Sequence, residues 1–331
     1  MGFVIVQFLT GLADASGLFM VACGLSLIFG VSRIVNFAHG SFYMVGAYLA
    51  YYLIGHLSPG GLSFWASILI SGFSVGLIGM LVEVLLLRRL YQSPELFILM
   101  GTFGVILIIQ DLSRWLFGSE DLLGPRCPGL DGSIDILGTL LPQYDLALIF
   151  IALLVLLMIW WLLNRTRWGI LVRAATQDRE MLAALGVNQS LLFTSVFFLG
   201  SFLAGLGGAL QLPKGGADLL MDLNVIASAF VVVVIGGMGS IPGAYLAALL
   251  IGELSAFGIL VLPQSTLVMM FLIMAVVLII RPYGLFGRNE SGEQPYDQKT
   301  YAPVKPSSGR LKLTGQGLLL FVLLMPLLVG D

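Results

Sequence analysis

The stretch that decides the fold is residues 24–50, GLSLIFGVSRIVNFAHGSFYMVGAYLA. Both of its ends are apolar, but its middle, from Gly30 to Gly40, contains serine, arginine, asparagine and histidine. A membrane-spanning helix needs about 20 mostly apolar residues, and inside the bilayer its backbone amides must be hydrogen-bonded within the segment. Glycine is a poor helix former, so the middle is unsuited to a continuous helix. The stretch therefore predicts two membrane helices joined by a polar break.

The composition of the whole chain also indicates a membrane protein. Of the 331 residues, 58% are hydrophobic and 10% charged, and the mean hydropathy is +1.01, so there is too little charge for the surface of a soluble globule. A net charge of -2, from 16 basic and 18 acidic residues, gives no indication of nucleic-acid binding. The two cysteines and two histidines form neither a disulfide framework nor a metal-ligand pattern. We therefore predict no metal, no cofactor and no catalytic residue.

Apolar runs of spanning length recur outward from the quoted stretch. They predict an all-α, polytopic transmembrane helical bundle of about eight spans with broken or re-entrant segments. The first run has no basic start and no cleavage site, so we interpret it as a retained span. A shorter run at 224–236 is either a full span or a re-entrant segment. The expected spans are 4–30, 37–55, 62–87, 95–116, 144–163, 191–213, 240–260 and 262–281.

The positions of the arginines orient the bundle. Arginine and lysine are retained preferentially in short cytoplasmic loops. They follow the third, fifth and eighth predicted spans, whereas residues 117–143 carry four acidic side chains against the lone Arg126. We therefore expect the N-terminus and Lys214 outside and Arg33 inside. The other inner arginines are Arg88, Arg89, Arg165, Arg167, Arg173, Arg179, Arg281 and Arg288.

Two glycine-containing breaks lie at membrane depth, where transporters expose backbone to a substrate. The first runs from Gly30 to Gly46 and the second from Gly236 to Gly243. The sequence Gly-Ala-Tyr-Leu-Ala occurs at 46–50 and again at 243–247, which suggests an internal parallel repeat. The substrate-pathway residues expected in the breaks are Asn36, His39, Gly40, Gly237, Gly239 and Ser240. Glycine also serves close helix packing, the function we expect for Gly200, Ala204, Gly207 and Gly208.

Several ionisable side chains fall inside the predicted spans, where a charge costs several kcal/mol. Asp14 and Glu253 lie near the middle of their spans and are the leading candidates for a polar pathway. The alternative is a structural hydrogen bond or ion pair between helices. His39 has a similar alternative, because an imidazole can satisfy backbone groups freed by the break. Glu83 and Asp111 lie one turn from Arg88 and Arg114, which favours snorkelling at a membrane surface.

The inner loop from Asn164 to Asn188 predicts a short helix from Arg173 to Leu185 that ends at Gly186. Its apolar residues suit a groove on a partner protein, and the alternative is a helix lying on lipid headgroups. The sequence contains no Gly-x-x-x-x-Gly-Lys-Ser/Thr phosphate loop and no extramembrane stretch long enough for a nucleotide-binding domain. If ATP powers transport, another polypeptide must hydrolyse it.

The composition changes after Arg288. Residues 289–312 are polar and contain proline and serine, which is typical of a linker. Residues 313–329 are apolar again but number only about 17, a marginal span. We therefore divide the chain into a permease domain at 1–288, a linker at 289–312 and an apolar segment at 313–331.

Three stretches together resemble a known family, the integral permeases of ATP-binding-cassette importers for branched-chain amino acids that pair with a second, related permease. The resemblance covers residues 4–288 in order. Residues 318–331 resemble the opening of the partner permease, so one interpretation is a fragment or remnant of a fused permease pair. The stretches are 24–30 running into Asn36-Phe37-Ala38-His39-Gly40 and 46–48, then 173–175 through Asp178 to Gly186, then 236–240 with 242–244.

The resemblance implies a multi-pass subunit of the bacterial inner membrane that moves branched-chain amino acids by alternating access. It implies four kinds of contact: a second permease, two ATP-binding-cassette ATPase subunits, a periplasmic substrate-binding protein and the lipid bilayer. The inner loop would be the coupling helix seated in the ATPase. The implied coupling residues are Arg173, Ala174, Ala175, Asp178, Glu180, Ala184 and Gly186.

Two other functions stay open on the sequence. The first is the same importer class carrying urea or short amides, because no side chain in the sequence identifies the substrate. A stand-alone secondary transporter would use Asp14 and Glu253 as proton or sodium sites. An intramembrane enzyme is the remotest alternative, since no histidine and carboxylate are paired at helical spacing.

Overall fold

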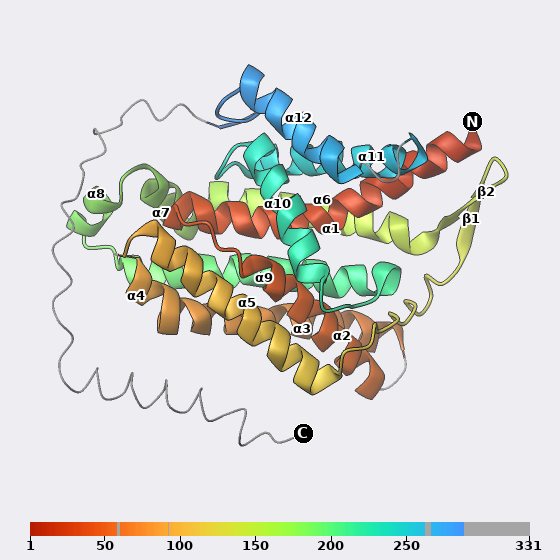
Figure 1. The fold of residues 1–331 in the computed structure, drawn as a ribbon, viewed down its shortest axis with the longest axis horizontal. Helices are drawn as coiled ribbons and strands as arrows, with labels where there is room; N and C mark the ends of the chain where they lie inside the picture. Colours follow the sequence, from red (N-terminus) through yellow and green to blue (C-terminus); the bar gives the residue numbers. More distant parts are fainter. Residues whose placement is uncertain (58–59, 92, 262–265, 288–331) are drawn as a thin grey trace. The chain divides into compact units, whose positions relative to one another are not determined.

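The computed structural model describes residues 1–287 except 58–59, 92 and 262–265. The predicted linker at 289–312 and apolar segment at 313–331 lie outside the described residues. The described part is almost entirely helical, which confirms the all-α prediction (Figure 1). Its helices are α1 (Gly2–Ser32), α2 (His39–His56), α3 (Gly61–Val82), the π-helical η1 (Glu83–Leu87), α4 (Arg88–Leu90), α5 (Glu95–Phe117), α6 (Gln143–Arg165), α7 (Arg167–Gln177), α8 (Arg179–Ala184), α9 (Gln189–Gly215), α10 (Met221–Gly236), α11 (Ile241–Val261) and α12 (Thr266–Ile280).

Six of the helical stretches are long and apolar enough to cross a bilayer. They correspond to α1, α3 through α4, α5, α6, α9 and α11. Helices α2, α10 and α12 have 18, 16 and 15 residues. At about 1.5 Å per residue they measure roughly 22–27 Å, less than the hydrocarbon thickness of about 30 Å. Two of these short helices, α2 and α10, adjoin the predicted breaks.

The connections gather at two opposite ends of the bundle (Figure 1). At one end the antiparallel strands β1 (Ser133–Ile136) and β2 (Thr139–Pro142) lie against Gly2, and Leu122 pairs with Ala217 through two backbone hydrogen bonds of 2.9 and 2.8 Å. At the other end lie α7 and α8, which belong to the arginine-bearing loop. The acidic loop and the N-terminus therefore share one end and the basic loop occupies the other, as the predicted orientation requires.

Small residues bring α9 into backbone contact with both α1 and α2. A Cβ atom on Gly24 would lie 2.4 Å from the carbonyl oxygen of Gly200, and one on Gly208 would lie 1.9 Å from that of Tyr43. Both glycines therefore admit no larger side chain. The predicted packing face on α9, which also includes Ala204 and Gly207, is confirmed.

The single helix predicted from Arg173 to Leu185 is wrong. The chain forms α7 and α8 instead, separated at Asp178, whose backbone is extended at φ -148° and ψ 107°. The Asp178 carboxylate accepts a hydrogen bond from the Met181 amide at 2.9 Å and so caps α8. Aspartate commonly bonds to nearby backbone in this way, which outweighs the helix propensity of its neighbours. The predicted end at Gly186 is confirmed, because Gly186 has φ 80° and its amide bonds to the Ala183 carbonyl at 2.9 Å.

Candidate functional site

The first break returns the chain from the inner end of α1 to the middle of the bundle. Asn36 forms a tight turn in which its side-chain oxygen accepts from the Ala38 amide at 3.1 Å. His39 begins α2, and its Nε2 donates to the Val21 carbonyl at 3.1 Å. Val21 lies eleven residues before the end of α1, or about 16 Å along the helix. Helix α2 therefore starts about 16 Å back along α1 from the end of that helix, and the break folds back into the bundle.

The polar residues of this break face protein. Asn36 and His39 are fully buried, and a Cβ atom on Gly40 would lie 2.3 Å from the carbonyl oxygen of Asp222. The contacts made by His39 and Gly40 hold α2 against α1 and α10. They favour a structural function for His39. None of Asn36, His39 and Gly40 lines the cavity described below.

The second break is a tight turn between α10 and α11. Gly237 and Gly239 have φ 96° and 82°, conformations that favour glycine. The Ser240 hydroxyl accepts from the Gly243 amide at 3.2 Å, which caps the start of α11. These three predicted pathway residues therefore shape the turn.

The chain after α12 closes over the second break. The Leu285 amide donates to the Ile235 carbonyl at 2.7 Å, and the Phe286 amide donates to the Gly236 carbonyl at 3.1 Å. The last carbonyls of α10 are thus satisfied by protein. The expectation that free backbone at this break lines the route is not supported at Gly236.

The two breaks contact each other beside α7. A Cβ atom on Gly30 would lie 3.2 Å from the Gly239 Cα and 3.7 Å from the Thr176 side chain. The guanidinium of Arg33 donates to the Thr176 carbonyl at 3.2 Å. Both breaks and the inner loop therefore meet at one place, although they are far apart in the sequence.

Asp14 is held in an ion-pair network. Its carboxylate lies 2.7 Å from the Lys214 ammonium, which also lies 3.5 Å from the carboxylate of Asp145. Asp145 is 3% exposed, so its charge requires a partner. The structural alternative foreseen for Asp14, an ion pair between helices, is therefore present, although Asp14 also lines the cavity described below.

Glu253 has a different environment. A Cβ atom on Gly11 would lie 2.8 Å from its carboxylate, so the side chain packs against the backbone of α1. Both carboxylate oxygens are buried, and neither has a hydrogen-bond partner among the described residues. Glu253 is therefore separate from the network around Lys214.

A second buried carboxylate, Asp222, was not singled out from the sequence. It is 1% exposed and accepts from the Ser41 hydroxyl at 3.0 Å and from the Gln110 amide at 3.1 and 3.0 Å. The network joins the starts of α2 and α10 to the middle of α5. Its position two residues before the predicted short run at 224–236 was the only available signal, because its partners are remote in sequence.

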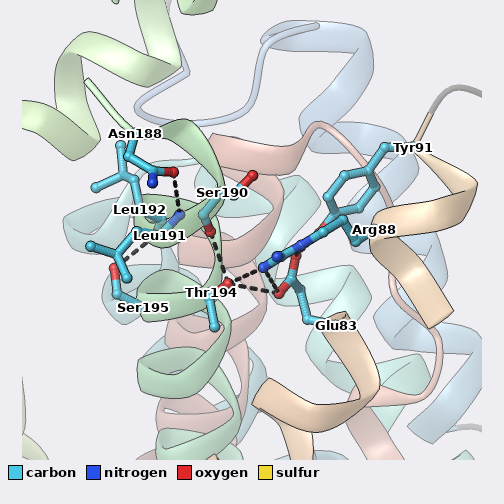
Figure 2. A network of polar contacts seen from close by, with 9 residues as sticks. All are labelled: Glu83, Arg88, Tyr91, Asn188, Ser190, Leu191, Leu192, Thr194 and Ser195. Carbon is cyan, nitrogen blue, oxygen red and sulfur yellow. Dashed lines mark hydrogen bonds and ion pairs between the residues drawn. The ribbon is translucent and has the colours of Figure 1, made fainter. Parts of the chain in front are cut away.

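Glu83 is also buried, so the snorkelling interpretation of this residue is wrong. It lies in η1 with no exposed side-chain surface, and its oxygens are 2.9–3.2 Å from the Arg88 guanidinium and 2.8 Å from the Thr194 hydroxyl (Figure 2). Arg88 also donates to Thr194, and the Tyr91 hydroxyl donates to Glu83 at 3.4 Å. This network ties the π-helical turn to Thr194, six residues after the inner loop ends at Asn188.

The inner loop presents apolar side chains outward. Met181 and Leu185 of this loop are 60% and 74% exposed, whereas Leu182 between them is 4% exposed and packs into the core. A large exposed apolar patch is typical of a protein contact.

The predicted coupling residues divide between the two sides of this loop. Ala175 is buried, Ala174 packs against the core, and Arg173 donates to the Asn164 side chain at 2.5 Å. Ala184 and Gly186 are exposed, whereas the side chain of Glu180 lies outside the described structure. Ala184 and Gly186, together with the exposed Arg173 and Asp178, are therefore placed to meet a partner directly.

A cavity of about 300 Å³ lies between α1, α2, α9, α10, α11 and α12. It reaches the outer connection between α9 and α10 through Asp218. Its polar lining includes Asp14, Tyr43, Gln211, Asp218, Asn224 and Ser255, and its apolar lining includes Leu18, Met221, Val225 and Met270.

Comparison with known proteins identifies the family. Residues 7–280 match the family described as branched-chain amino acid transport system / permease component. The permease protein BraD of Pseudomonas aeruginosa, named as part of a high-affinity branched-chain amino acid transport system, is 29% identical over 295 residues, covering 86% of this chain and 96% of BraD. The similarly named LivH of Escherichia coli is 25% identical over 294 residues, with coverage of 86% and 96%. LivM of the same organism is 28% identical over 302 residues, with coverage of 83% and 70%. No solved structure matches significantly.

Proposed function

This chain belongs to the family of permease components of branched-chain amino acid transport systems, and from that membership we propose that it translocates leucine, isoleucine and valine as one permease subunit of an ATP-binding-cassette importer. The chain is a multi-pass membrane protein. The proposal adds the bacterial inner membrane as its location. A periplasmic binding protein would deliver the substrate, a second related permease would complete the pore, and two ATPase subunits would hydrolyse ATP.

The contact between the inner loop and the two breaks supports this proposal most directly. Thr176 of α7 lies against Gly30 and binds Arg33, and Gly30 lies against Gly239. A displacement of α7 by a motor protein would therefore reach both breaks at once. Alternating access requires such a connection, because the route must open to one side as the ATPase subunits close.

The exposed face of α8 supplies a docking surface for the ATPase. Met181, Ala184 and Leu185 are exposed there, and α8 continues from α7 after Asp178. An apolar helix face fits a groove on a folded partner. We propose α8 as the contact element and α7 as the element that transmits its movement.

The domain division is part of the same proposal. Residues 1–288 would form the permease and 289–312 would form a linker, with 313–331 resembling the start of the partner permease. These last two segments lie outside the described residues.

The alternative of a stand-alone ion-coupled transporter is less well supported. It needs Asp14 as a cation site, and the Asp14 carboxylate is already paired with Lys214 at 2.7 Å. Glu253 has no such partner among the described residues and is the only one of the two proposed ion sites that would still be free.

The proposal is tested by introducing a charge on α8 in the complete importer. Ala184→Glu keeps a good helix former at an exposed position, whereas a change at Gly186 would strain a residue with φ 80°. We expect loss of leucine uptake and of binding-protein-stimulated ATP hydrolysis, while Leu123→Glu, an exposed control in the outer loop, leaves both intact. Full uptake with Ala184→Glu would refute the coupling role. Uptake that survives ATP depletion and collapses with the ion gradient would refute the importer.

A further inference from the structure

The cavity between α1, α2, α9, α10, α11 and α12 has a polar lining that the family assignment does not explain. Tyr43 lines it and is 6% exposed. The side-chain oxygen of Gln211 is buried and lacks a partner in the described part of the chain. A buried polar group without a partner is costly, so such groups indicate a ligand or ordered water.

The charges around the cavity favour a cationic group. Asp14 and Asp218 line it. Lys214 is shared between Asp14 and Asp145. Two carboxylates thus share one ammonium, and Asp218 adds a further negative charge that has no ion-pair partner among the described residues, which leaves a negative local potential.

The remaining lining suits the other parts of an amino acid. The Tyr43 hydroxyl, the Asn224 amide and the Ser255 hydroxyl can donate to a carboxylate. Met221 and Met270 form part of the apolar wall, and methionine adapts to side chains of different shape. A volume of about 300 Å³ is at the lower end of the range of small-molecule sites.

We propose that this cavity is a binding site for a zwitterionic aliphatic amino acid, with its ammonium at Asp218 and its carboxylate at Tyr43. This inference rests on the proposed function for the identity of the solute. It places a substrate site within a single permease chain, on the side of the bundle that carries the acidic loop. Of the first predicted break only Tyr43 lines it, and no residue of the second break, 236–243, does.

The first experiment measures protection from a thiol reagent in the assembled importer. Both native cysteines are replaced by serine, and Ser228→Cys places a thiol in the cavity lining. We expect L-leucine to slow labelling of this thiol severalfold. The corresponding keto acid, 4-methyl-2-oxopentanoate, has the same side chain and no ammonium and should not protect. No protection by leucine, or equal protection by both compounds, overturns the proposal.

The second experiment removes the two recognition groups one at a time. Asp218→Asn keeps the acceptor that binds the Leu220 amide at 2.8 Å but removes the charge. The leucine concentration needed for protection should rise about tenfold, as expected for loss of a charged hydrogen bond. Tyr43→Phe should also weaken protection. Asp121→Asn and Tyr52→Phe, exposed controls outside the cavity, should change nothing. Unchanged protection in both test variants overturns the assignment.

Leucine uptake by the unmodified importer in proteoliposomes separates this inference from the proposed function. Protection without uptake retains the binding site and refutes the importer assignment. Uptake without protection retains the importer and refutes the binding site.

Discussion

Gly30 and Gly239 pack so closely that a Cβ atom on Gly30 would lie 3.2 Å from the Cα of Gly239. The first residue ends a helix near the start of the chain and the second lies in the turn before α11. Since Thr176 also contacts Gly30, this pair is the point where the inner loop can act on both breaks.

A bulky side chain at Gly30 should therefore uncouple the importer. Gly30→Leu would push Gly239 and Thr176 away, an overpacking that costs about 1–3 kcal/mol. We expect leucine uptake to fall severalfold while the subunits still assemble, as measured by uptake and by co-purification of the ATPase. Gly104→Leu is the matched control, because a Cβ atom there has open space. Wild-type uptake by Gly30→Leu would show that the contact of Gly30 with Gly239 and Thr176 does not transmit movement.

Arg88 should be more important for stability than its partly exposed position suggests. Arg88→Met would leave the fully buried carboxylate of Glu83 with the Thr194 and Tyr91 hydroxyls alone (Figure 2). Removing one member of a buried ion pair lowers the free energy of unfolding by about 3–5 kcal/mol. We expect a clear drop in the temperature of thermal unfolding in detergent, whereas the exposed neighbour Arg89→Met should have little effect.

The double variant Arg88→Met with Glu83→Met checks the cause. It removes both charges, so most of the lost stability should return. If the double variant is as unstable as Arg88→Met, the effect comes from packing and the ion pair is unimportant.

The sequence was sufficient for the helices, the two breaks and the packing face of α9, because these follow from local apolar runs and from glycine. It was insufficient for the partners of buried charges. Asp145 and Lys214 lie on different helices, and nothing local indicates that they meet. The split at Asp178 depends on one side-chain hydrogen bond that competes with helix propensity. The cavity was missed because it depends on how six helices pack.

The thiol of Cys127 should titrate at unusually high pH. Burial, assisted by the negative charge of Asp131, raises the pKa of Cys127 in the outer loop from 9.0 to about 11. Because the folded protein retains this proton longer than the unfolded chain, the group's contribution to stability is complete below pH 9 and is lost between pH 9 and about 11. Alkylation of Cys127 in a Cys23→Ser background should therefore rise with a midpoint near pH 11. A midpoint at or below pH 9 would contradict the buried position of this thiol.

Lys214 should be required to neutralise the carboxylates around it. Lys214→Met would leave Asp145, which is 3% exposed, and Asp14 without a cation. We expect the free energy of unfolding to fall by about 3–5 kcal/mol, which would be measured as reduced thermal stability in detergent. Adding Asp145→Asn should restore part of the lost stability, since the most deeply buried charge is then gone. The control is Arg126→Met at an exposed basic residue of the outer loop, which should have no effect. Because the Lys214–Asp145 pair is largely buried, raising the salt concentration should not reproduce the loss of thermal stability. If Lys214→Met is as stable as Arg126→Met, Asp14 must be neutralised by another group, and its assignment as a structural ion pair is wrong.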